Sequence, residues 1–292
     1  MRQLLRTTVT VFVALVFTAG MAFGQENEAT IDQVGSNLES TVDQTGEDGT
    51  ATVDQEGDYL NSTVNQGGMT NETDVIQTGG RENFESVVSV EQFGEENDVF
   101  INQGGDDNEA MAVQGEGTSN NLIQISSGNQ GPTQTGFSNK VEAYQREGTS
   151  GSKIFVDQNG DGNFAFGSDR KVVAEQVGES NSTIDVFESR TGVAGGDVDV
   201  LQKNGEGNLA DLDLTGGGHK ADVFQDGVSS SEVFVEQTSG AQSTAGNHTV
   251  DVDQLNGSNN MVDVMQSGRS QNATVYQNGS TNSATVTQSG GN

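Results

Sequence analysis

Residues 51–66 read ATVDQEGDYLNSTVNQ and contain one five-residue pattern twice, Ala/Ser-Thr-Val-Asp/Asn-Gln, with the two glutamines 11 residues apart. Alternation within the pattern is typical of a β-strand, because successive side chains of a strand point to opposite faces. The β-branched residues fit a pleated surface. We expect the face that carries Ala or Ser, Val and Gln to point inward, and the face that carries Thr and Asp or Asn to meet solvent.

The 11-residue spacing recurs along most of the chain. Nine intervals of this length separate glutamines at positions 33, 44, 55, 66 and 77, at 92, 103 and 114, at 134 and 145, and at 266, 277 and 288. Glycine follows most of these glutamines by two residues, and glycine is tolerated in tight turns. A fixed period of this kind indicates a repeat architecture rather than disorder.

Each unit provides about five residues of strand and six of turn, too few to bury an inner face alone, so neighbouring units must stack. Two units would form a coil of about 22 residues, with coils separated by roughly 4.8 Å. The sequence therefore predicts an all-β protein, a β-solenoid of strand-turn-strand repeats with amyloid-like cross-β stacking. Stacked glutamines would bond amide to amide. The expected core ladder consists of Gln33, Gln44, Gln55, Gln66, Gln77, Gln92, Gln103, Gln114, Gln266, Gln277, Gln288, Val42, Val53, Val64, Val75, Val264, Val275 and Val286.

The repeat resembles the curlin repeat. Gln277, Gly279, Asn282, Ala284 and Gln288 match its pattern at the right offsets, and the resemblance covers most of residues 29–292. The match is uneven, since the glutamine spacing widens in places and an apolar residue, Leu214, takes one glutamine position. We expect residues 115–250 to be less regular, with loops or bulges around Pro132, Gly148–Ser152 and Thr191–Gly196.

The resemblance implies a secreted structural subunit of a curli-like functional amyloid fibre, a pilus or fimbrium of the cell surface that mediates cell adhesion and biofilm formation. It also implies self-association into fibres, passage through an outer-membrane secretion pore, and a second curlin-like subunit as partner. An enzyme is not expected, and no cofactor is.

Residues 1–24 are predicted to be a signal peptide, with a basic start, an apolar stretch and a small-residue cleavage site, which leaves residues 25–292 as the mature repeat domain. Removing them takes away two of 12 basic and none of 43 acidic residues, so the net charge changes from -31 to -33. This acidic surface would repel nucleic acid. No membrane insertion is expected, and the absence of cysteine excludes disulfides.

Three groups of residues have the composition of a site. Asp157–Asn163 begins like a calcium loop but lacks the closing glutamate, so we interpret it as an Asp/Gly turn, with calcium binding as the alternative. His219 and His248 have no partner at metal-ligand spacing in the sequence and are not predicted to form a site. Acidic residues that directly precede a repeat glutamine form a solvated face or a diffuse cation-binding ladder: Asp32, Asp43, Asp54, Glu91, Asp157, Glu175, Glu236 and Asp253.

A second function remains open on the sequence alone. Outward threonines such as Thr41, Thr52 and Thr63 could form a flat face on a monomeric secreted solenoid that binds an ice, mineral or carbohydrate surface. Such a protein would stay monomeric at high salt, whereas a fibre subunit would not.

Overall fold

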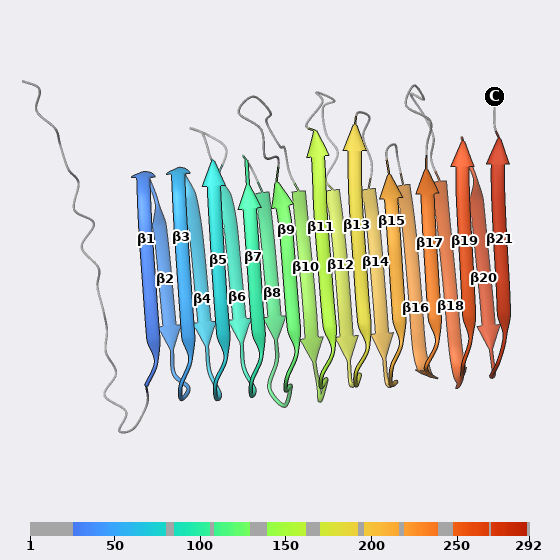
Figure 1. Ribbon diagram of the computed structural model, residues 1–292, viewed down its shortest axis with the longest axis horizontal. Coiled ribbons are helices and arrows are strands. Elements are labelled where there is room, and N and C mark those ends of the chain that lie inside the picture. The colour runs from blue at the N-terminus through green and yellow to red at the C-terminus, as the bar shows by residue number, and fades with distance from the viewer. Residues whose placement is uncertain are drawn as a thin grey trace, which may run out of the picture.

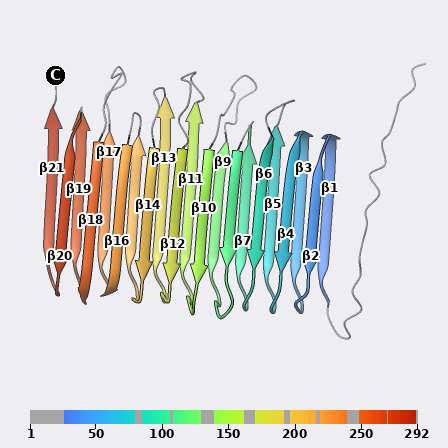
Figure 2. The same cartoon turned by 180° about the vertical axis from the view of Figure 1, so that it is seen from behind.

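The computed structural model describes residues 26–79, 85–105, 108–128, 139–161, 170–191, 196–215, 219–238, 248–268 and 270–290. The described chain forms 21 β-strands in two parallel sheets that lie back to back, with the first and last strands at opposite ends (Figure 1 and Figure 2). Within these ranges no helix is long and apolar enough to cross a membrane. The predicted signal peptide, residues 1–24, lies outside the described residues.

The odd-numbered strands form one sheet of 11 strands, called sheet A here: β1 (Glu28–Ser36), β3 (Thr50–Asp58), β5 (Glu72–Gly79), β7 (Asp98–Gly104), β9 (Leu122–Gly128), β11 (Lys153–Asp161), β13 (Thr183–Thr191), β15 (Leu209–Thr215), β17 (Glu232–Thr238), β19 (Met261–Gly268) and β21 (Ser283–Gly290). The even-numbered strands form sheet B, which has 10 strands: β2 (Glu39–Gln44), β4 (Leu60–Gln66), β6 (Ser86–Gln92), β8 (Asn108–Gln114), β10 (Asn139–Arg146), β12 (Arg170–Val177), β14 (Gly196–Lys203), β16 (His219–Ser229), β18 (His248–Ser258) and β20 (Asn272–Asn278).

The chain alternates between the sheets at every strand and so winds as a solenoid, which confirms the prediction of an all-β solenoid. Each strand pairs in parallel with the equivalent strand one coil on, and the repeat glutamines lie in register, as Gln33 does with Gln55. The predicted 22-residue coil occurs at both ends of the stack, but the coil lengthens to 31 residues between Gln114 and Gln145. Both sheets continue through the segment for which irregularity was predicted.

The longest insertions lie on one edge of the solenoid. Connections from sheet B to sheet A, called the uniform edge, are two to seven residues long, and all of them are described. Connections from sheet A to sheet B vary from one residue between β3 and β4 to ten between β9 and β10. The loop expected around Pro132 falls on this variable edge, outside the described residues, whereas Gly148–Ser152 forms a turn of the uniform edge. The glutamine register survives the insertions because they enter only at the turns.

The core is a thin layer between the sheets. Strand residues alternate between buried and partly or fully exposed positions, and the inner face of each strand carries Val, Ile or Ala beside Gln, as Ala51, Val53 and Gln55 do in β3. These three side chains have no exposed surface. Burial of apolar area contributes roughly 25 cal/mol per Å², and each coil gains it from the coils on both sides.

The turns differ from expectation in one respect. Glycine and asparagine were predicted to supply the positive φ of the turns, and Gly57 and Asn37 do so with φ +141° and +56°, but left-handed positions are also filled by Tyr59, Thr70 and Glu96 with φ between 53° and 56°. Glycine is also required at position 57 because the backbone of the next coil lies close to it. A Cβ at Gly57 would lie 1.7 Å from the carbonyl oxygen of Gly79 in the next coil, so the backbones touch there.

Candidate functional site

The inner face of sheet B carries an unbroken ladder of ten glutamines. In each step the side-chain Nε2 of one glutamine donates a hydrogen bond to Oε1 of the glutamine in the next coil, at 2.7–3.0 Å. All nine bonds run in the same direction along the chain. The members are Gln44, Gln66, Gln92, Gln114, Gln145, Gln176, Gln202, Gln225, Gln254 and Gln277.

The second hydrogen of Nε2 ties the two sheets together. Gln66 Nε2 also donates to the carbonyl of Thr50 in sheet A at 3.1 Å, and Gln277 Nε2 donates in the same way to Met261. A buried amide left without partners would cost about 1–3 kcal/mol. The ladder therefore meets the hydrogen-bonding needs of a polar column inside an apolar core.

The corresponding ladder in sheet A is interrupted. Its first part runs from Gln33 through Gln55 and Gln77 to Gln103, and its last part from Gln237 through Gln266 to Gln288. The strand register places Ser127, Gln158, Glu188 and Leu214 at the four positions between.

The two ends of this gap leave buried polar atoms unsatisfied. Nε2 of Gln103 and Oε1 of Gln237 are both buried without a hydrogen-bond partner. The sequence indicated that Leu214 occupies a glutamine position, and the structure places Leu214 there, fully buried and in register with Gln237.

A second polar ladder runs along the uniform edge, at the residue six positions before each repeat glutamine of sheet A. Oδ1 of Asn71 accepts the backbone N–H of Asn97 at 3.0 Å, and serine takes the same role where Oγ of Ser182 accepts the N–H of Asn208 at 3.1 Å. Asn or Ser therefore recurs at this position because its side chain satisfies the backbone of the next coil.

The predicted valines lie on the inner face of the sheets. Val53, Val64, Val75 and Val264 have no exposed surface, and Val275 is 8% exposed. Val42 and Val286, in the end strands β2 and β21, are only partly buried, because each has a neighbouring coil on one side.

The two ends of the solenoid differ in charge. Strands β1 and β2 carry Glu28, Asp32, Glu39 and Asp43, whereas no residue between 270 and 290 is charged. At both ends the outer edge of the last strand has no neighbour among the described residues. Such edges are templates for further strands.

The structure brings together two histidines that were not predicted to form a site. His219 and His248 occupy the same position in β16 and β18, both are buried, and their rings stack with centroids 5.7 Å apart and an interplanar angle of 11°. Burial lowers the pKa of His248, although a contact between its Nε2 and the carbonyl of Gly268 acts in the opposite direction. The signal in the sequence was that each lies six residues before a repeat glutamine.

Acidic residues stack on the outer faces of the sheets. Most of the stacked acids are not the ones that were predicted to form a ladder. Of the acids that directly precede a glutamine, Asp32 and Asp54 are paired in register. A longer column, Asp199, Asp222 and Asp251, lies on the outer face of sheet B. Partial burial, followed by repulsion from these two neighbours, raises the pKa of Asp222.

No grouping of three or more potential metal ligands occurs among the described residues. The calcium-like string Asp157–Asn163 runs along the end of β11 and past it, and its last two residues lie outside the described ranges. Asp157 itself is an exposed residue of the outer face.

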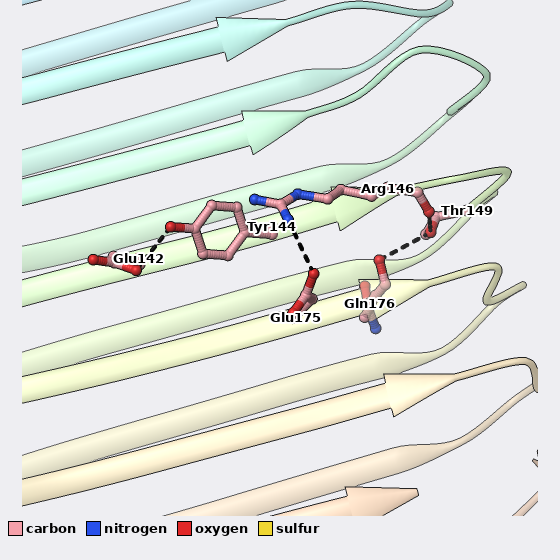
Figure 3. A network of polar contacts seen from close by, with 6 residues as sticks. All are labelled: Glu142, Tyr144, Arg146, Thr149, Glu175 and Gln176. Atoms are coloured by element: carbon pink, nitrogen blue, oxygen red, sulfur yellow. Dashed lines mark hydrogen bonds and ion pairs between the residues drawn. The ribbon is translucent and has the colours of Figure 1, made fainter. Parts of the chain in front are cut away.

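The outer face of sheet B also holds a small polar network around Arg146 (Figure 3). The guanidinium group lies 4.1 Å above the ring of Tyr144 and pairs with Glu175 at 3.3 Å. The hydroxyl of Tyr144 donates to Glu142 at 2.7 Å, and burial followed by this bond raises the pKa of Tyr144. The network joins β10 to β12 and is exposed, so we ascribe to it a minor structural role.

Among the described residues, one carboxylate is fully buried. Glu179, in the turn between β12 and β13, accepts hydrogen bonds on Oε2 from Ser182 Oγ at 2.5 Å and Asn208 Nδ2 at 3.1 Å. Burial raises its pKa in spite of these bonds. It occupies the turn position held by Gly205 one coil on, where a Cβ would lie 3.0 Å from Oε1 of Glu179, so the larger side chain fills the space beside a glycine.

The comparisons with known proteins agree with the geometry of the two ends. A family model described as the curlin associated repeat matches residues 23–46, 46–79 and 257–290. These segments include the regular coils at the beginning and end of the solenoid. A comparison with curated proteins finds no match to the chain. Three matches to one repeat model, together with the stacked coils and glutamine ladders, show that the two ends of the chain are built from curlin associated repeats.

Proposed function

We propose that this protein is a structural subunit of a curli-like extracellular amyloid fibre that contributes to cell adhesion and biofilm matrix. The proposal rests on the open ends of the two glutamine ladders. Both glutamine ladders reach the end strands and stop at open parallel edges, and the outermost rungs Gln33, Gln44 and Gln288 are only half-buried. A further copy would bury them and complete their amide bonds.

The fibre would extend the stack of parallel strands of one chain and would in this way acquire a cross-β arrangement. Strands lie perpendicular to the stack direction, and identical side chains such as Gln44 and Gln66 lie one above the other. Addition of copies at the ends would extend this arrangement without a change of fold. A role as a secreted subunit that passes an outer-membrane pore and assembles with a second curlin-like subunit is part of this proposal and rests on the family.

The net charge of -33 for residues 25–292 would make assembly dependent on ionic strength. Acidic surfaces repel one another at low salt, and the Debye length falls from about 30 Å at 0.01 M to about 10 Å at 0.1 M. We therefore expect slow assembly in dilute buffer and faster assembly in saline.

The alternative of a monomeric surface binder receives little support from the outer faces. The column that begins with Thr30 and Thr52 continues with Asp74 and Phe100, and the column that begins with Thr41 and Thr63 continues with Ser89. Neither forms an even row of one residue type, so neither offers a regular lattice of hydroxyl groups.

The test uses purified residues 25–292 at low and high salt, with electron microscopy, X-ray diffraction of aligned material and seeding of fresh monomer. We expect fibres with reflections near 4.7 and 10 Å that seed growth. Two lysine variants in the last strand test whether growth depends on the inner face of its open edge. V286K places a charge on the inner face of β21 and should block growth, whereas T287K lies on the exposed outer face and should not. A β-rich monomer that no seed converts would exclude the fibre.

A further inference from the structure

We infer that successive copies in the fibre are related by half a turn about the fibre axis, so that sheet A of one copy continues as sheet B of the next. Strand β20 would then pair with β1 of the next copy, and β21 with β2. The inference rests on the proposed fibre function and specifies the interface that the fibre would use.

The two sheets differ in their number of strands. Between Glu28 and Gly290 the described chain contributes 11 strands to sheet A and 10 to sheet B, so sheet A supplies the outermost strand at both ends (Figure 1). After β21 the next free strand position lies in sheet B, beside β20. In a head-to-tail stack the solenoid continues without a gap only if β1 of the next copy occupies that position.

A half turn about the stack axis achieves this. The strands lie across the axis, and the two sheets run in opposite directions (Figure 1). The rotation exchanges the sheets and reverses each strand, so β1 of the next copy arrives beside β20 in the parallel direction. Without rotation β1 would pair with β21, and one strand position between β20 and the next β2 would stay empty, with its backbone groups unpaired.

The hydrogen-bond direction of the ladders fits the same contact. Every rung donates from Nε2 towards the C-terminal end of the stack, so Gln277 and Gln288 end the ladders as donors. Gln33 and Gln44 begin them, and their Oε1 atoms are the acceptors that a preceding rung would use. In the half-turn stack Gln277 meets Gln33 of the next copy, and Gln288 meets Gln44.

The register set by these glutamines places like side chains together. Val275 would lie beside Ile31 of the next copy, and Val286 beside Val42, all on the inner face. Gly290 would lie beside Gly46. That match matters because the glycines of neighbouring coils touch within the chain, where a Cβ at Gly268 would lie 2.1 Å from the carbonyl oxygen of Gly290.

Charge favours the head-to-tail direction. The four acids of β1 and β2, Glu28, Asp32, Glu39 and Asp43, would face strands β20 and β21, which carry no charge. A contact between two N-terminal ends would place these acids against one another. Like charges directly opposite on neighbouring strands are destabilising.

Cysteine pairs distinguish the two stacks, because the natural chain contains no cysteine. The exposed outward residue Thr285 of β21 lies three positions before Gln288, and Thr30 and Thr41 hold the equivalent positions in β1 and β2. In the half-turn stack Thr285 is about one strand spacing, roughly 4.8 Å, from Thr41 of the next copy. Thr30 then lies on the opposite outer face. In the unrotated stack Thr30 and Thr41 exchange these roles.

The experiment uses residues 25–292 with T41C/T285C and, as the matched variant, T30C/T285C, each assembled into fibres before a short thiol-specific cross-linker is added. The two positions of each pair lie at opposite ends of one molecule, so every cross-link joins two copies. We expect T41C/T285C to give a ladder of covalent multimers on a denaturing gel, and T30C/T285C to remain monomeric. Fibres in which T30C/T285C cross-links instead, or in which the two pairs behave alike, overturn the half turn but leave the fibre. Failure of the unsubstituted chain to form fibres would instead remove the proposed function.

Discussion

Leu214 lies in register directly before Gln237 in sheet A, and Oε1 of Gln237 is buried without a hydrogen-bond donor. At the other end of the same gap, Nε2 of Gln103 has no acceptor. Sheet B carries glutamine at the equivalent position in all ten strands and has no such break. A glutamine should therefore contribute more to the free energy of unfolding in sheet B than beside the gap in sheet A.

Replacement by leucine tests this difference. Q145L removes the donor to Oε1 of Gln176 and leaves that oxygen buried without another hydrogen bond, so we expect a loss of about 1–3 kcal/mol in the free energy of unfolding. Q103L removes an amide nitrogen that already has no partner, and Gln77 keeps its bonds to the carbonyls of Asn61 and Ser86. This variant should be neutral or stabilising.

The measurement is urea unfolding of the monomer at low salt, supported by hydrogen exchange of the strands beside each substitution. Leu214 shows that the fold accommodates leucine in this position, so overpacking does not explain a loss. An equal loss in both variants would mean that the ladder bonds do not contribute to stability.

Much of this fold follows from the sequence, since one repeat with a fixed glutamine position specifies both the strand and its inner face. The register of the middle coils could not be predicted. Gln145 and Gln176 are adjacent rungs although 31 residues separate them, and only the structure shows that most of the extra residues lie in the connection at the variable edge. The histidine pair was missed for the same reason, because stacking joins residues that are 29 positions apart in the chain.

The stacked histidines should make β16 and β18 sensitive to mild acid. Burial lowers the pKa of His248 below its ordinary value of 6.5, so the unfolded state binds the proton more readily than the folded state. Local stability is then complete above about pH 6.5 and is lost as the pH falls from there through the lowered pKa. His248→Asn, which copies Asn108 at the same position of sheet B, should abolish this loss.

Hydrogen exchange of β16–β18 at pH 7.5 and pH 5.5 measures the effect. We expect the unsubstituted protein to lose protection at the lower pH, and H248N to keep it. Strands β4 and β6, which contain no histidine, serve as an internal reference for other pH effects. A loss of the same size in H248N would assign the effect to other groups.

The column Asp199, Asp222 and Asp251 should give stability the opposite pH dependence to that of the histidines. Burial and the two neighbouring acids raise the pKa of Asp222 above 3.8, so the folded state holds its proton more tightly and stability falls as the pH rises through that range. D222N should stabilise the protein at pH 7 by roughly 0.2–1 kcal/mol, less at high salt. Asp263 lies at the equivalent position between Phe234 and Thr285, so D263N is the matched control and should show no such gain.

Urea unfolding of both variants at low and high salt gives the comparison. A gain in D222N that salt leaves unchanged would point to packing rather than charge repulsion. Equal gains in the two variants would show that the overall negative charge matters and the column does not.

Close contact between coils makes some glycines irreplaceable, and Gly57 and Gly148 differ in the space beside them. A Cβ at Gly57 would lie 1.7 Å from the backbone oxygen of Gly79, which cannot move without opening the sheet, whereas a Cβ at Gly148 meets no atom within 4 Å. Both glycines have positive φ, +141° and +80°. G148A should therefore cost only the conformational strain of about 1–2 kcal/mol, while G57A should disrupt the pairing of β3 with β5. Urea unfolding together with hydrogen exchange of these strands measures both effects. If the two variants lost the same stability and kept the same protection, conformational strain alone would explain the glycines, and the close approach of the coils would not be what selects them.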